Sequence, residues 1–60
     1  MPRFRYYYEY DPEVDAWSIL EEDGGYEHGD YYDAFLFDCA TEDDARGAVQ
    51  VLTDLASKRK

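Results

Sequence analysis

Acidic and aromatic residues are interleaved over most of this 60-residue chain. From Tyr6 to Ala45 there are fourteen Asp and Glu residues and no Lys or Arg, and ten of the eleven aromatic residues lie in the same stretch. High charge with few aromatic residues would predict disorder. Each aromatic side chain, however, can bury roughly 150–250 Å² of surface. We therefore expect a folded domain whose architecture must accommodate many aromatic rings.

The length of the chain limits how it can be stabilised. A single domain of 60 residues buries only about 60% of the surface that its unfolded chain exposes. Such domains usually need disulfides, a metal or a partner subunit. Cys39 is the only cysteine, so an internal disulfide is excluded, and Cys39 and His28 are too few soft ligands for a structural zinc site. Rich aromatic packing and oligomerisation remain as the two ways to stabilise the fold.

Alternation of apolar and polar residues predicts three strands. Aromatic residues recur at every second position over residues 4–10, and alternation also covers residues 14–21 and about 31–37. Asp11-Pro12-Glu13 fits a type I turn after the first strand. The glycine-containing segment from Glu22, extending through Asp30, predicts a loop between the second and third strands.

The clearest element is a helix over about residues 42–57. Thr41 precedes three acidic residues, which fits an N-cap followed by acids in the first turn of a helix. Ala, Val and Leu then recur at helical spacing. The order of strand, strand, strand and helix predicts an α+β fold in which an antiparallel meander carries the helix on one face.

One helix covers only one face of such a sheet, although large apolar residues occur in both registers of the second and third strands. We expect Phe4, Tyr6 and Tyr8 in the core and Tyr7 in an exposed or interface position. Some aromatic residues must lie on the uncovered face, where an apolar patch usually marks an interface. Two copies packed sheet to sheet would bury this face, as would a different protein. The homodimer is the simpler hypothesis.

Enzymatic activity is not expected. Cys39 and His28 could form a nucleophile pair, but a predicted strand separates them and no protease signature surrounds them. Paired carboxylates are too abundant to be a specific signal, and the acidic segments do not match an EF-hand loop. We therefore expect no catalytic residues, no cofactor and no metal.

The formal net charge of −9 argues against direct binding of nucleic acid or anionic membranes. No apolar run approaches the ~18 residues of a spanning helix, and the first residues lack the apolar core of a signal peptide. A lone cysteine is typical of a reducing compartment. The expected location is the cytoplasm, or the host cytoplasm if the protein is viral.

The leading functional hypothesis is mimicry of nucleic acid. Carboxylates spaced along strands and turns can occupy a basic groove that normally holds phosphates, and aromatic residues can supply contact area. The partner would be a nucleic-acid-handling protein with a basic surface, which this chain would inhibit or modulate. Trp17 and Tyr32 would be anchors if their registers face outward. The candidate partner-binding residues are Tyr7, Glu9, Asp11, Glu13, Asp15, Trp17, Glu21, Glu22, Asp23, Asp30, Tyr32 and Asp33.

Two other interpretations of the acidity remain open. An excess of acids over lysines is typical of proteins adapted to high salt, so the chain could be a halophile's small domain of unknown function. Ordinary solubility is the other explanation. The concentration of acids in the first three-quarters of the chain favours a binding function over both.

In size, acidity and strand-rich layout the chain resembles phage-encoded accessory proteins that bind and inhibit host machinery, anti-CRISPR proteins among them. The order of three strands and a helix is also similar to antitoxin domains of the HicB type, although the chain lacks their basic DNA-binding segment. No motif carries either resemblance, so neither implies particular site residues.

Overall fold

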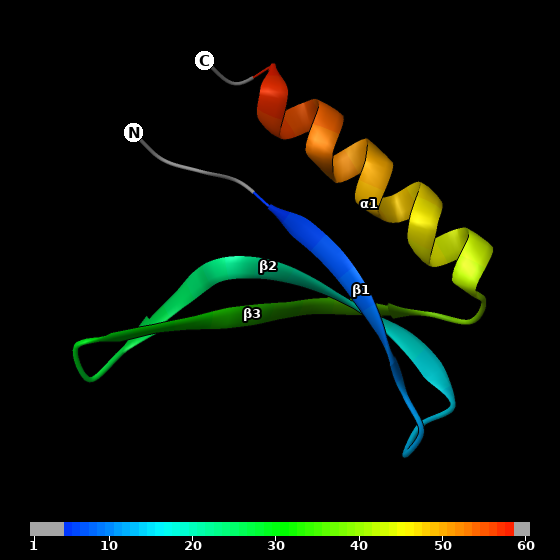
Figure 1. Cartoon of the computed structure of the whole chain (residues 1–60), viewed down its shortest axis with the longest axis horizontal. Coiled ribbons are helices and arrows are strands. Elements are labelled where there is room, and N and C mark those ends of the chain that lie inside the picture. Colours follow the sequence, from blue (N-terminus) through cyan, green and yellow to red (C-terminus); the bar gives the residue numbers. More distant parts are fainter. Residues whose placement is uncertain (1–4, 59–60) are drawn as a thin grey trace.

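The computed structural model describes residues 5–58. They form three strands and one helix: β1 (Tyr6–Asp11), β2 (Ala16–Glu27), β3 (Asp30–Cys39) and α1 (Glu42–Ser57). The strands make one antiparallel sheet in the order β1-β2-β3 (Figure 1). The predicted α+β fold, a meander followed by one C-terminal helix, is therefore confirmed.

The second hairpin is longer than the sequence pattern predicts. The segment that we expected to be a loop continues β2 to Glu27, and only His28 and Gly29 separate β2 from β3. Both residues have positive φ angles, 53° and 87°, as a two-residue type I′ turn requires. The glycines before this turn do not end the strand, because two extra residues between Glu21 and Gly25 form an irregularity within β2. Phe4, expected in the core, lies outside the described residues.

The register assigns side chains to the two faces of the sheet. Tyr8, Ile19 and Phe37 are paired across the strands and share one face, since directly opposite residues point the same way. The Tyr8 hydroxyl donates a 3.0 Å hydrogen bond to Glu42 in the first turn of α1, so this face is the one turned toward the helix. Tyr7, Leu20 and Phe35 share the opposite face. Leu36 is an extra residue of β3 between the two sets of pairs.

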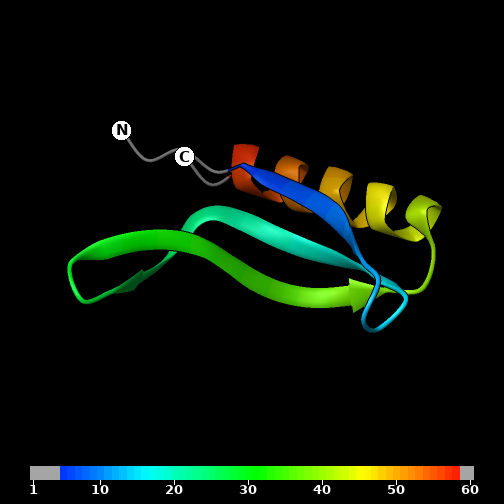
Figure 2. The same cartoon turned by 60° about the horizontal axis from the view of Figure 1, so that its bottom comes forward.

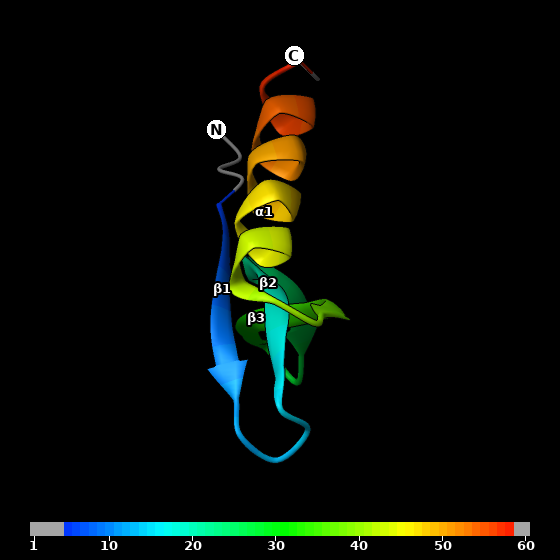
Figure 3. The ribbon, with the colours of Figure 1, turned by 90° about the vertical axis from the view of Figure 1, so that its right-hand side faces the viewer.

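The helix begins where the sequence predicts. Thr41 is the N-cap, and its side chain accepts a 3.1 Å hydrogen bond from the backbone N–H of Asp44. The helix contacts all three strands. Figure 2 shows it on one side of the sheet, and Figure 3 shows β1 running alongside it. No described element covers the other side of the sheet.

The core is very small for so aromatic a chain. Among the described residues only Ile19 and Ala45 are fully buried apolar residues, and Ser18 is 7% exposed. The molecule is a thin plate of 34 × 30 × 11 Å. A molecule only 11 Å thick in one direction surrounds few side chains on all sides, which explains why most aromatic side chains keep contact with solvent.

Candidate protein-binding surface

The structure distributes the candidate partner-binding residues over three places rather than one. A first group of candidates lies at the end of β1 and in the turn to β2. A second group lies in the middle of the sheet around Tyr7, and a third at the tip of the β2–β3 hairpin. The two turns occupy different corners of the sheet in Figure 1.

The first group has the densest charge, and we call it the acidic turn: Glu9, Asp11, Glu13 and Asp15. Asp11 ends β1, and its side chain accepts a 3.0 Å hydrogen bond from the backbone N–H of Glu13. This local bond is typical of Asp at the start of a turn. Asp15 adopts a left-handed conformation with φ of 52° before β2 begins. The four carboxylates thus come from the end of β1 and from the turn that follows it.

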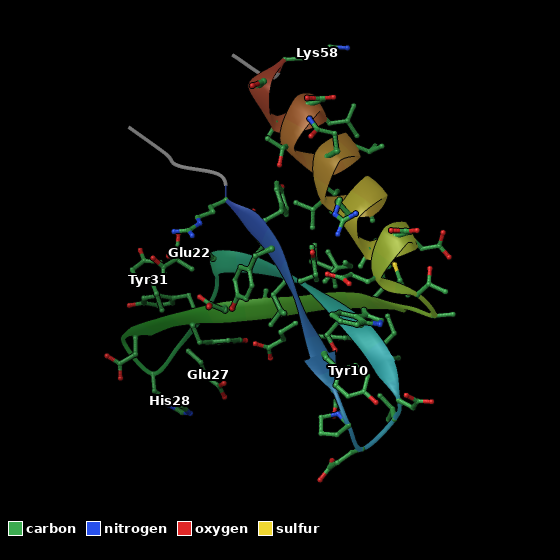
Figure 4. The ribbon with its side chains drawn as sticks, turned by 45° about the vertical axis from the view of Figure 1, so that its right-hand side comes forward. Tyr10, Glu22, Glu27, His28, Tyr31 and Lys58 are labelled. Atoms are coloured by element: carbon green, nitrogen blue, oxygen red, sulfur yellow. The ribbon has the colours of Figure 1, made fainter. Side chains whose placement is uncertain are left out.

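Aromatic and apolar side chains accompany these carboxylates. Tyr10 is 46% exposed and Val14 is 56% exposed. The Tyr10 hydroxyl donates a 2.6 Å hydrogen bond to Asp15, and this bond raises the pKa of Tyr10. In Figure 4 Tyr10 lies by the turn, at the opposite end of the molecule from Lys58. The acidic turn thus combines four negative charges, two of them held by hydrogen bonds, with apolar surface beside them.

The second group is a hydrogen-bonded network on the face away from the helix. The Tyr7 hydroxyl donates to Asp33, which also accepts a 3.0 Å bond from the backbone N–H of Asp23. The bond to Asp33 raises the pKa of Tyr7 to about 12. The same bond lowers the pKa of Asp33. The half-buried Tyr7 therefore links β1 to β3 across the sheet. Arg5 and Glu22, 3.8 Å apart, form an exposed ion pair at the end of this network.

The third group contains Asp30 and Tyr32. Tyr32 is 51% exposed, and its ring lies directly over Gly25 of β2. Tyr26 and Tyr31 stack edge to face next to the hairpin tip, with ring centroids 4.8 Å apart. Figure 4 shows Glu27 and His28 at this tip.

Trp17 is half-buried and does not project freely from the sheet. It packs between the rings of Tyr8 and Tyr10, at centroid distances of 5.7 and 5.2 Å. Exposed rings that we did not include among the candidates, Tyr31 and Phe35, lie instead on β3. The presence of aromatic residues in both registers of β3 was the sequence signal that could have identified them.

Sequence reasoning also missed how the acids are held. Each of the four tyrosines of β1 donates to a carboxylate on a different part of the fold: Tyr6 to Glu21 of β2 at 3.5 Å, Tyr7 to Asp33 of β3, Tyr8 to Glu42 of α1, and Tyr10 to Asp15 in the turn. A stretch with many acids and no basic residues leaves the tyrosine hydroxyls as the main side-chain donors.

Most of the negative charge has no positive partner nearby. Of the fifteen carboxylates, only Glu22, Glu27, Glu42 and Asp43 lie within 4 Å of a basic side chain from residues 5–58, and the partner of Glu27 is His28. The other eleven carboxylates are Glu9, Asp11, Glu13, Asp15, Glu21, Asp23, Asp30, Asp33, Asp38, Asp44 and Asp54.

Residues 5–58 contain neither a metal-binding cluster nor a membrane-spanning helix. Within that range no group of three or more His, Cys, Asp or Glu side chains is arranged to hold a metal ion. The single helix found there is neither long enough nor apolar enough to cross a membrane.

The fold and this surface define a small acidic α+β domain of βββα order. Comparison of the chain with protein-family models, with curated proteins and with solved structures finds no match.

Proposed function

We propose that the chain is a non-enzymatic interaction protein that binds a basic surface of a nucleic-acid-handling protein and inhibits or modulates that protein. The observation that supports this function best is the uncompensated charge. Eleven carboxylates have no basic side chain within 4 Å in the described part of the chain, and exposed aromatic residues lie among them. Unpaired charge of one sign attracts partners of the opposite sign.

The acidic turn is the part of the surface best suited to this role. Proteins that bind nucleic acid present Lys and Arg side chains to closely spaced phosphates. The four carboxylates of the acidic turn can accept hydrogen bonds from the same side chains. Tyr10 and Val14, both about half exposed, add apolar contact area next to the charges.

Hydrogen bonds within the turn prepare two of the carboxylates for binding. Asp11 is held by the backbone of Glu13, and Asp15 is held by Tyr10. A group that is already ordered loses less conformational entropy when a partner binds. Association would be fast at low ionic strength and would weaken steeply as salt screens the charges.

The test is capture of a partner at two salt concentrations, followed by competition. The immobilised chain is exposed to host lysate at about 0.05 M and about 0.5 M salt, concentrations that span a large change in Debye length. The captured protein is then purified, and its affinity for the chain is measured with and without duplex DNA. We expect a basic protein that is released by salt and displaced by DNA.

Two triple variants with equal charge locate the surface. Asp11→Asn, Glu13→Gln and Asp15→Asn together neutralise the acidic turn, whereas Asp43→Asn, Asp44→Asn and Asp54→Asn remove the same charge from the helix. Affinity should fall at least tenfold in the first variant and change little in the second. Salt-independent capture, or equal losses in both variants, would contradict the proposal.

A further inference from the structure

Strand β3 exposes large apolar side chains on both of its faces. On the face away from the helix, Tyr31 is 68% exposed and Phe35 is 59% exposed. On the face toward the helix, Phe37 is still 43% exposed. A partner that packed against one face of the sheet would cover only one of these sets. A strand that paired with the edge of β3 would place its own side chains beside the exposed side chains on both faces of the sheet.

The outer edge of β3 is open. In the sheet order β1-β2-β3, β3 is paired only with β2, over a strand of ten residues. Edge strands are usually protected by charged side chains, especially lysine, by proline, by β-bulges, by short length or by a covering element. β3 carries three aspartates and the extra residue Leu36, but it has no lysine, arginine or proline, and its length is about twice that of a typical strand. Its unpaired backbone N–H and C=O groups can therefore accept another strand.

We propose that two copies of this chain pair through β3, antiparallel and edge to edge, and form a continuous six-stranded sheet. A second copy is the occupant that the size of the core favours. With only Ile19 and Ala45 fully buried and no possible internal disulfide, the chain needs a permanent stabilising contact rather than a transient one. A homodimer provides such a contact before any other partner is met.

The acids of β3 limit the register of the pair. Like charges placed directly opposite each other destabilise a strand pair. The three aspartates of β3, Asp30, Asp33 and Asp38, must therefore lie opposite uncharged residues of the second copy.

Light scattering after size-exclusion chromatography gives the first test. We expect the wild type to have about twice the 7.1 kDa chain mass. Phe35→Lys and Phe37→Lys should each give the monomer mass, because each replaces a large apolar side chain of the paired strand with a charged one. Val51→Lys is the matched control: Val51 is 58% exposed, close to the 59% of Phe35, but it lies on the helix, and this variant should stay dimeric.

Each other outcome overturns edge pairing. A wild type with the monomer mass excludes the dimer. Dissociation by Phe35→Lys alone would indicate two sheets packed face to face, because Phe37 lies on the other face. Dissociation by Val51→Lys would place the helix in the interface.

Hydrogen exchange of the wild type tests the proposal even if the lysine variants fail to fold. Alternate backbone N–H groups of β3 point away from β2 and exchange rapidly in a monomer. In the edge-paired dimer they are protected, and their protection rises with protein concentration. Rapid exchange of these amides at all concentrations would exclude pairing through β3.

Discussion

At the scale of single residues, the tyrosine hydroxyls of β1 connect this strand to β2, β3, α1 and the first turn. Each hydroxyl donates to a carboxylate, a role that Lys and Arg side chains usually have. A hydroxyl brings no positive charge, so it orders the carboxylate without cancelling its charge. The surface therefore stays strongly negative although its side chains are held in place.

The Tyr7–Asp33 bond should make stability depend on pH at both ends of the scale. The pKa of Tyr7 is raised from 10.0 to about 12, so this contribution is complete below pH 10 and is lost as pH rises through 12. The pKa of Asp33 is lowered from 3.8, so the contribution is complete above pH 3.8 and is lost on further acidification. The difference in unfolding free energy between wild type and Tyr7→Phe should be largest between these limits, as measured by urea titration at several pH values.

Tyr31→Phe is the control for this experiment. The Tyr31 ring stacks on Tyr26, and the substitution keeps the ring. Its effect on the unfolding free energy should be the same across the pH range. If Tyr7→Phe also gave a pH-independent difference, the bond to Asp33 would make no contribution in solution.

At the scale of secondary-structure elements, the N-cap of α1 should contribute measurable stability. Thr41→Ala removes the acceptor for the backbone N–H of Asp44. The expected loss is about 1 kcal/mol, or a fall in melting temperature of about 4–8 °C for a domain of this size. Circular dichroism during thermal unfolding measures both.

Thr53→Ala is the matched substitution, because Thr53 is exposed within the same helix. Alanine is the better helix former, so this variant should be at least as stable as the wild type. Equal losses at Thr41 and Thr53 would show that the cap is not formed.

Two glycines should respond in opposite directions to the same change. A Cβ at Gly25 would lie 2.3 Å from the ring of Tyr32, whereas a Cβ at Gly47 in the exposed helix would meet nothing within 4 Å. Gly25→Ala should therefore destabilise the second hairpin. Gly47→Ala should stabilise the protein by about 0.5–1 kcal/mol. Urea unfolding of both variants checks the pair, and a Gly25→Ala variant as stable as wild type would contradict the position of Tyr32.

The elements differ in how well the sequence predicts them, for physical reasons. The bounds of α1 were correct because Thr41 and the following acids are local signals. The extension of β2 through Gly24 and Gly25 was missed because it depends on long-range contacts: Tyr32 covers Gly25, and Asp33 holds the backbone of Asp23.

The same distinction applies to the candidate surface. The turn after β1 was predicted from Asp11 and Pro12, because its residues are neighbours in the sequence. The link from Tyr7 to Asp33 spans 26 residues and depends on the register of three strands. No local pattern contains that information.

At the scale of the whole molecule, the chain is flat and highly charged. Its radius of gyration is 12.3 Å, against about 10 Å for a compact chain of 60 residues. A plate of this shape has little interior and a large perimeter. The acidic turn joins β1 to β2, whereas the open edge belongs to β3. If both proposals hold, a partner and a second copy would bind at different strands of the sheet.

The response to salt should separate a binding function from adaptation to a saline environment. Repulsion among the carboxylates weakens as the Debye length falls from ~30 Å at 0.01 M to ~8 Å at 0.15 M salt. If the acids serve a partner, the protein should already be folded at about 0.01 M salt and should gain modest stability at 0.15 M. Circular dichroism at fixed protein concentration measures this. A chain that unfolds at low salt and recovers only at molar salt would support the halophile interpretation instead.

The position of Trp17 makes it an intrinsic fluorescent probe of the molecule. It is the only tryptophan, and it lies between Tyr8 and Tyr10, whose excitation energy it can accept. Its emission is thus sensitive to the packing of β1 and β2 beside the acidic turn. Partner binding at that turn and unfolding of the sheet can both be followed by fluorescence of the unlabelled protein.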